Sequence, residues 1–169
     1  MRFHRTRILS ILFVCLVAIS ASAADRITDL RPTVLLISID GCRYDYLDKI
    51  DTPSLHSIIN RGTRAKYMIP SFPTKTFPNH YSMVTGLYPA HHGIVANNMF
   101  DPEMNARFKM ENAADTRWWG GEPIWVTAEN QGVRTAPLLW PGSQAKEKGV
   151  EPSCGLAWSE GISIVERIA

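Results

Sequence analysis

The sequence of 169 residues has few cysteines, no basic run after its first residues and no N-glycosylation site. It contains only three cysteines, and because Cys15 lies in the first two dozen residues, Cys42 and Cys154 allow one disulfide bridge at most. No basic run or stripe follows those first residues, so neither a nucleic-acid groove nor a basic membrane-binding patch is indicated. Asn-x-Ser/Thr glycosylation sites are also absent.

What is present at the amino terminus has the pattern of a secretory signal peptide. Three arginines in the first seven residues precede an apolar run over residues 8–19, and small residues follow at positions 21–23. The run is shorter than the roughly 20 residues that span a bilayer. We therefore expect residues 1–23 to be cleaved after Ala23, which leaves 15 basic and 16 acidic residues in a secreted or periplasmic protein. The alternative is a retained signal anchor with an extracytoplasmic domain, the one case in which a membrane would be a partner.

Beyond residue 31, strand-like and helix-like patterns alternate along the chain. We expect strands over residues 33–39, 65–69 and 133–139, and helices from Pro53 to Gly62, from Asn79 to Gly86 and from Glu122 to Asn130. This alternation predicts an α/β fold with a mainly parallel sheet flanked by helices. Residues 96–121 show no clean periodicity, and we expect them to form a long insertion loop.

Asp40 directly follows the first predicted strand. The carboxyl ends of parallel strands are where open α/β sheets bind ligands, and a carboxylate is a suitable ligand for a hard divalent metal. Asp40 is therefore a candidate metal ligand. For the Asp40-Gly41 pair taken alone, an ordinary turn is the more common outcome.

Thr76 lies just before the amino terminus of a predicted helix. A hydroxyl in this position is usually a helix cap. The amides and dipole of the same helix end also form an anion site, where a hydroxyl can attack a phosphorus whose oxygens are held by the helix. A divalent cation nearby would lower the pKa of such a hydroxyl.

Several short motifs occur in a fixed order between Arg31 and Ser153. They are Val34-Leu-Leu-Ile-Ser-Ile-Asp-Gly41, Pro73-Thr-Lys-Thr-Phe-Pro-Asn-His-Tyr81, Val84-Thr-Gly-Leu-Tyr-Pro89, His92-Gly-Ile94, Gly121-Glu-Pro-Ile-Trp125 and Trp140-Pro-Gly-Ser143. In this order they resemble nucleotide pyrophosphatases/phosphodiesterases, which belong to the alkaline phosphatase superfamily. The resemblance implies an alkaline-phosphatase-like fold, two zinc ions, and nucleotide or nucleotide-sugar phosphodiester substrates. The implied reaction is hydrolysis of phosphodiester or pyrophosphate bonds, with release of nucleoside 5′-monophosphates through a threonine-linked intermediate.

The resemblance also implies roles for individual residues. Thr76 would be the nucleophile, Asp40 would ligate the zinc ion that also contacts Thr76, and Asn97 would donate a hydrogen bond to a phosphate oxygen in the transition state. Phe77 resembles the aromatic on which a nucleobase stacks, with a core aromatic as the alternative. Lys75 would assist with phosphate charge, and an exposed lysine without a specific role is the alternative.

Other conspicuous residues are given structural roles. The resemblance assigns packing and capping to His80, His91 and His92, so none of them is predicted to bind zinc. We expect Trp118 and Trp119 to form a packed lid rather than a second platform for a base.

The resemblance covers residues 31–153, the amino-terminal part of a catalytic domain, after a linker at residues 24–30. Residues 154–169 form an unplaced tail. The family's two-zinc site needs further aspartates and histidines from sequence beyond Ser143, so we expect an incomplete site and sheet. Two hypotheses follow, an enzyme of this family and a catalytically silent truncated fragment of one. A phosphomonoesterase or phosphoglycerate mutase relative ranks third, because it would normally use serine.

Overall fold

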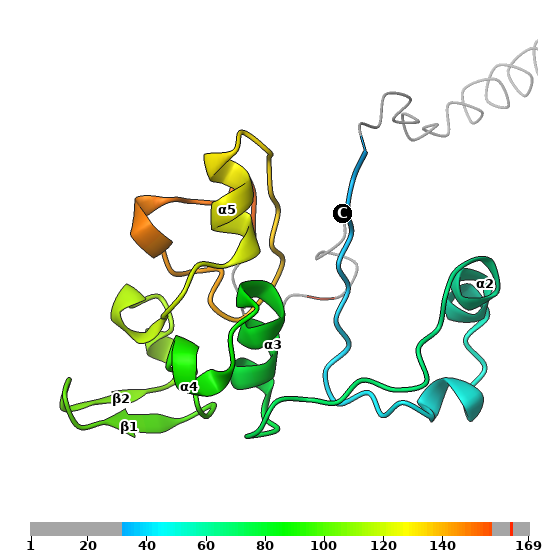
Figure 1. Ribbon diagram of the computed structural model, residues 1–169, viewed down its shortest axis with the longest axis horizontal. Helices are drawn as coiled ribbons and strands as arrows, with labels where there is room; N and C mark the ends of the chain where they lie inside the picture. The colour runs from blue at the N-terminus through cyan, green and yellow to red at the C-terminus, as the bar shows by residue number, and fades with distance from the viewer. Residues whose placement is uncertain (1–31, 157–162, 164–169) are drawn as a thin grey trace, which may run out of the picture. The chain divides into compact units, whose positions relative to one another are not determined.

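The computed structural model describes residues 32–156 and residue 163 (Figure 1). The predicted signal peptide at 1–23, the linker at 24–30 and most of the tail at 154–169 therefore lie outside the described residues. Two compact units divide the chain, Met1–Ile37 and Ser38–Ala169, and the second holds every helix and strand named below. No helix of the described part is long and apolar enough to cross a membrane.

The regular elements are short and mostly helical. Helices and strands follow in the order α2 (Pro53–Arg61), α3 (Thr76–Thr85), α4 (Pro89–His92), β1 (Met99–Asp101), β2 (Ala106–Phe108) and α5 (Ile124–Asn130). Four 3-10 turns accompany them, η1 (Tyr46–Asp48), η2 (Met110–Asn112), η3 (Thr116–Trp118) and η4 (Glu147–Gly149). The three predicted helices are thus present, with boundaries shifted by a few residues.

The helix boundaries follow from local chemistry. α2 has Thr52 as its N-cap and a proline in its first turn, and it ends at Gly62 as expected. Gly86 ends α3 with φ of 69°, a left-handed conformation that favours glycine. The start of α3 differs from the prediction, because Lys75 is the N-cap and Thr76 is the first helical residue rather than the residue before the helix.

The prediction of a mainly parallel sheet is not met in the described residues. Their one sheet is the antiparallel pair β1–β2, in which Met99 lies opposite Phe108. Residues 33–39 form no ladder, and Val34 and Leu35 are 93% and 80% exposed. Residues 65–69 are likewise not a strand, and residues 133–139 form only an isolated parallel bridge between Leu138 and Leu156. A strand requires a hydrogen-bonded neighbour, and the described residues supply no ladder partner for 33–39 or 65–69 and only a short one, residues 154–156, for 133–139.

The stretch over residues 96–121 is more ordered than the predicted insertion loop. It holds the β1–β2 hairpin, η2 and η3. At the hairpin turn, Oδ1 of Asp101 accepts hydrogen bonds from the amides of Glu103 and Met104, both at 2.8 Å. β2 carries Phe108 into the core, and η3 and the residue after it carry Trp118 and Trp119, so the sequence between predicted elements contributes much of the packing.

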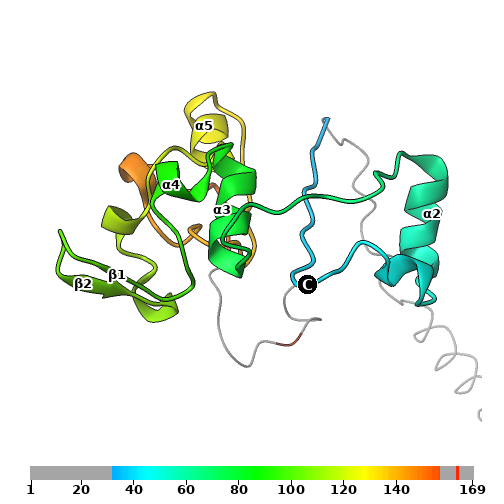
Figure 2. The same cartoon turned by 60° about the horizontal axis from the view of Figure 1, so that its bottom comes forward.

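Aromatic side chains form the core against one face of α3. The buried aromatic members are Phe77 and Tyr81 from α3, Phe108 from β2, Trp118, Trp119 and Trp125. Tyr81 and Trp119 pack edge to face with ring centroids 4.7 Å apart, a favourable aromatic geometry. The prediction that Trp118 and Trp119 are packed is confirmed, since they are 4% and 5% exposed. α3 and α4 lie next to each other, as both views show (Figure 2).

The structure also places the first residues of the unplaced tail. The amide of Cys154 donates to the carbonyl of Thr135, and the amide of Leu156 donates to that of Pro137. Glu129 of α5 reinforces this pairing, because its carboxylate accepts hydrogen bonds from Thr135 and Ser153. Residues 153–156 are therefore bound to the segment that follows α5.

Candidate functional site

The candidate site is built on a contact between Thr76 and Asp40. Thr76 is the first residue of α3, and its hydroxyl donates a hydrogen bond of 3.0 Å to Oδ2 of Asp40, 36 residues earlier in the chain. Asp40 is exposed and Thr76 is partly buried, so both oxygens can meet a ligand from solvent. Two residues singled out from the sequence for different reasons are thus brought together by the fold.

Asn79 fixes the loop that presents Thr76. Its side-chain Oδ1 accepts a 2.7 Å hydrogen bond from the amide of Ser71. Its Nδ2 donates to the carbonyls of Ser71, Pro73 and Lys75 at 3.0 to 3.2 Å. One amide side chain therefore binds both ends of the loop before Thr76. No sequence pattern pointed to a role for Asn79, whose only signal was its place in the motif that contains Thr76.

Asn97 is the third predicted site residue that the structure brings to the start of α3. Its Oδ1 accepts a 3.0 Å hydrogen bond from the backbone amide of Phe77. Because that amide can only donate, the oxygen of Asn97 must face it, and Nδ2 is directed elsewhere. No hydrogen bond from this Nδ2 occurs within the described residues, so it remains a donor for a ligand oxygen.

The first turn of α3 offers an anion fewer unbonded amides than a helix start usually provides. The amide of Phe77 is bonded to Asn97, Pro78 has no N–H, and the amide of Asn79 is bonded within the turn. Among the first four residues of α3, Thr76 alone has an amide without a partner in the described part of the chain. An anion here would thus be met by one backbone N–H, the helix dipole and the free Nδ2 of Asn97.

Phe77 and Lys75, the two neighbours of Thr76, lie in opposite environments. Phe77 is 6% exposed, with its ring 5.5 Å from Phe108 and 6.2 Å from Trp119. This burial favours the core alternative, and a stacking role for Phe77 stays a prediction. Lys75 is exposed, and within the described residues its ammonium group pairs with no carboxylate. It therefore remains a free positive charge beside Thr76.

The two buried histidines lie against serine hydroxyls. His92 is fully buried, with Nε2 2.9 Å from the hydroxyl of Ser82, and Nδ1 accepts a hydrogen bond from the amide of Ile94. Burial lowers the pKa of His92, which keeps the ring neutral. His80 is 8% exposed and also lies against a serine hydroxyl. Both rings therefore have hydrogen-bond partners within the described residues.

The described residues fit a metal ion only in part. Asp40 and Thr76 supply two oxygen atoms of the hard type that divalent ions accept. A catalytic zinc ion takes about three protein ligands, and within residues 32–156 no group of three His, Cys, Asp or Glu side chains is arranged to hold an ion. These two oxygens alone do not make a metal site among the described residues.

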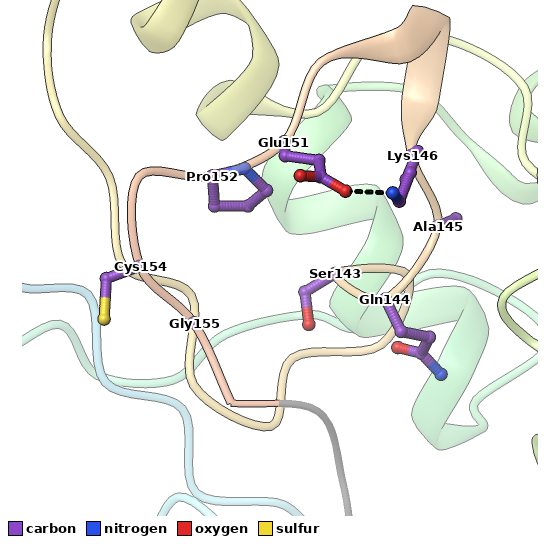
Figure 3. Close-up of a pocket in the computed structure, with 8 residues that line it drawn as sticks. All are labelled: Ser143, Gln144, Ala145, Lys146, Glu151, Pro152, Cys154 and Gly155. Carbon is purple, nitrogen blue, oxygen red and sulfur yellow. Dashed lines mark ion pairs between the residues drawn. The ribbon is translucent and has the colours of Figure 1, made fainter.

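A separate pocket of about 180 Å³ lies near the tail and is not part of this site (Figure 3). Lys146 and Glu151 form an ion pair at its wall, and the exposed thiol of Cys154 lies nearby. None of Asp40, Thr76 and Asn97 lines this pocket. The chemistry-bearing residues instead gather on the open surface at the start of α3.

At the start of α3 the structure thus brings together a hydroxyl, a carboxylate and an unbonded amide donor, groups of the kinds that hydrolases with a hydroxyl nucleophile use. The chain belongs to the type I phosphodiesterase / nucleotide pyrophosphatase family, whose model matches residues 34–168. This match extends past Ser153 and includes most of the segment 154–169, which the sequence patterns left outside the family. The residues that the family model matches therefore include the whole candidate site.

Named relatives show the same similarity. The chain is 50% identical over 127 residues to an uncharacterized pyrophosphatase/phosphodiesterase of Schizosaccharomyces pombe, covering 73% of this chain and 26% of that one. It is 44% identical over 141 residues to human ectonucleotide pyrophosphatase/phosphodiesterase family member 1, covering 81% and 15%. These curated relatives are therefore several times longer than the part that the chain matches.

A solved structure supports the fold. Murine ectonucleotide pyrophosphatase/phosphodiesterase 5, an inactive threonine-to-alanine variant in complex with AMP, matches with a TM-score of 0.73 and 40% identity. The match covers 78% of this chain and 36% of the murine chain. The described residues therefore follow part of that relative's fold, although they form no parallel sheet of their own.

Proposed function

We propose that this chain supplies the nucleophile-bearing part of an enzyme that hydrolyses nucleotide phosphodiester or pyrophosphate bonds. The observation that carries the proposal is the 3.0 Å hydrogen bond between Thr76 and Asp40, at a helix start that Asn97 also contacts. Family membership supports the reaction class, and the contact with Asp40 supports Thr76 as its nucleophile.

In the proposed reaction, Oγ1 of Thr76 attacks the phosphorus atom. The hydroxyl hydrogen points at Asp40, so the lone pairs of Oγ1 are directed away from the carboxylate, toward an approaching phosphate ester. The bond from Oγ1 to phosphorus forms as the bond from phosphorus to the leaving oxygen breaks. In this step the proton of Thr76 passes to the Asp40 carboxylate, to which the hydroxyl is hydrogen-bonded, and from there to the leaving oxygen. Water then cleaves the threonine ester, restores the hydroxyl and releases a nucleoside 5′-monophosphate.

Three donors near Thr76 are suited to the charge that develops on the phosphate. They are Nδ2 of Asn97, the backbone amide of Thr76 and the ammonium group of Lys75. The oxygen of Asn97 is already bonded to the amide of Phe77, so its donor is oriented before a substrate arrives. A preorganised donor of this kind contributes about 3 to 4 kcal/mol to transition-state stabilisation.

Zinc is proposed as the metal, with Asp40 and Thr76 as two of its ligands. The carboxylate and hydroxyl oxygens are chemically suited to this role, and further ligands must come from outside the described residues. A divalent ion bound there would lower the pKa of the Thr76 hydroxyl and so favour its attack.

A nucleotide is the proposed substrate, and the site is proposed to lie outside the cytoplasm. AMP bound to the murine relative supports a nucleoside monophosphate as product. The prefix ecto- in the names of relatives and the signal-peptide pattern of residues 1–23 support an extracytoplasmic location. Recognition of the base is left open, because the ring of Phe77 is buried.

Hydrolysis of p-nitrophenyl thymidine 5′-monophosphate by the purified protein, with zinc added, tests the proposal. The Thr76→Ala variant removes the nucleophile, and Thr74→Ala is a matched control because Thr74 is an exposed threonine two residues earlier. Zinc-dependent turnover that survives Thr74→Ala and is lost in Thr76→Ala would support an enzyme. If the folded protein has no turnover, the silent-fragment hypothesis holds instead, which the lack of a three-ligand cluster in the described part favours.

A further inference from the structure

His80 connects the start of α3 to the segment that carries Asp40. Its Nδ1 lies 2.8 Å from the backbone carbonyl oxygen of Thr76, and its Nε2 lies 2.8 Å from the hydroxyl of Ser38. A carbonyl oxygen only accepts, so Nδ1 carries the hydrogen, and in the neutral ring Nε2 accepts from Ser38. One imidazole ring is thus bonded at both nitrogens, to Thr76 itself and to a residue two positions before Asp40.

The ring of His80 is held in place by a third contact. The imidazole ring packs edge to face against the indole of Trp140, with ring centroids 5.5 Å apart. The same indole donates a 3.0 Å hydrogen bond from Nε1 to the backbone carbonyl of His80. His80 is only 8% exposed. Since its side-chain atoms have fixed partners and little contact with water, the ring is a rigid spacer between α3 and Ser38.

The Thr76–Asp40 contact, in contrast, has little intrinsic strength. Asp40 is exposed, so water competes for both of its oxygens. Two hydrogen bonds found in the described part join residues 38–40 to α3. They are the bond of Asp40 to Thr76 and the bond of Ser38 to His80. The more buried Ser38–His80 bond is therefore the contact able to keep Asp40 at a fixed distance from Thr76.

We propose that His80 is a positioning residue which, through Ser38, holds Asp40 against Thr76. This inference rests on the proposed function for its effect on catalysis, whereas its effect on geometry stands independently. Loss of the Ser38–His80 bond releases Asp40 from Thr76 without removing either group. Misplacement of a reacting group by about 1 Å can lower a rate by as much as 100-fold, so the effect is measurable.

The first test measures geometry without requiring turnover. The Asp40→Asn substitution should shift the NMR signal of the Thr76 methyl group, because the carboxylate bonds to the neighbouring hydroxyl. In a Ser38→Ala or His80→Asn background we expect this Asp40-dependent shift to fall to less than about half. The shorter asparagine side chain can replace only the Nδ1 contact with the Thr76 carbonyl. The longer glutamine of His80→Gln can replace the Nε2 contact with Ser38 and should restore the shift.

Ser82→Ala is the matched control. Ser82 lies on α3 and bonds Nε2 of His92 at 2.9 Å, so this variant removes a Ser–His bond of nearly the same length that does not involve Thr76. We expect the Asp40-dependent shift to stay at its original size in this variant. A shift that survives both Ser38→Ala and His80→Asn, or that falls equally in Ser82→Ala, would overturn the proposal.

The second test is kinetic and separates the two proposals. In turnover assays, Ser38→Ala and His80→Asn should each lower kcat about tenfold with KM changed less than about twofold, and the double variant should lose no more than either alone. His80→Gln should recover most of kcat. Additive losses would contradict the positioning role. If no variant turns over substrate but the methyl shifts change as expected, the proposed function fails while the positioning role of His80 stands.

Discussion

The hydroxyl of Thr76 lies 3.0 Å from Oδ2 of Asp40, although neither residue is near the other in the sequence. Thr76 begins α3, and Asp40 follows an extended segment that forms no ladder in the described residues. A helix start and a loop thereby share a hydrogen bond at an exposed surface. This is the geometry that a phosphate ester and a metal ion would both meet.

Replacement of Asp40 by asparagine should reduce hydrolysis of p-nitrophenyl thymidine 5′-monophosphate about 100-fold, because the side chain keeps its shape but loses its charge. Asp51→Asn is the control, since Asp51 is also exposed but has no contact with Thr76. The zinc concentration that gives half-maximal rate should rise in the Asp40 variant alone. If the two variants hydrolysed the substrate at equal rates, Asp40 would have no role in the site.

Two adjacent asparagines allow a test of the proposed phosphate donor. Asn97→Ala should lower kcat by about 100-fold, since both the free Nδ2 and the bond that orients it are lost. Asn98→Ala should leave kcat unchanged, because Asn98 is exposed and has no hydrogen bond in the described region. Steady-state kinetics would check both, and a loss confined to KM in Asn97→Ala would contradict a transition-state role.

Glu129 should make stability depend on pH in the acid range. Its pKa is lowered to about 2, chiefly because the hydroxyl of Thr135 and the amide of Ser153 donate to the charged form. A lowered pKa in the folded protein means that the contribution to stability is present above pH 4.5 and is lost as pH falls toward 2. The urea midpoint should therefore drop more steeply between pH 5 and 3 than in Glu129→Gln, which cannot titrate.

Glu103→Gln is the control for this measurement. Glu103 is exposed, and its carboxylate has no hydrogen bond or ion pair within the described residues, so this variant should follow the wild-type pH profile. If the profile of Glu129→Gln is parallel to that of the wild type, Glu129 does not contribute in the way the structure indicates.

Gly142 should be more sensitive to substitution than Gly132. Both have positive φ, 91° and 75°, so alanine at either position costs about 1 to 2 kcal/mol from backbone strain. A Cβ at Gly142 would also lie 3.0 Å from the ring of Tyr81 and 3.1 Å from that of Trp119, whereas a Cβ at Gly132 meets nothing within 4 Å. Overpacking should therefore destabilise Gly142→Ala by about 1 to 3 kcal/mol more. Equal unfolding midpoints for the two variants would contradict this packing.

The helices and the family were accessible from the sequence. Helix hydrogen bonds join residues four positions apart, so signals such as Pro53, Gly62 and Gly86 act on their own segments and mark real boundaries. Asp40 and Thr76 were first marked by their places after a predicted strand and before a predicted helix, and their roles came from a motif resemblance that the family match confirms. Roles for Asp40, Thr76 and Asn97 remain predictions, although the structure brings all three to one place.

Tertiary structure alone decided the strands and the partners of individual side chains. Residues 33–39 and 133–139 have the composition of strands. A ladder also needs a second segment beside them, and the local sequence does not specify where that segment lies. For the same reason the bond between Ser38 and His80 and the contacts of Glu129 were not predicted, and the sequence left Phe77 with two alternative roles. Local hydrogen bonding determined the helices from the sequence, whereas contacts between distant residues required the folded chain.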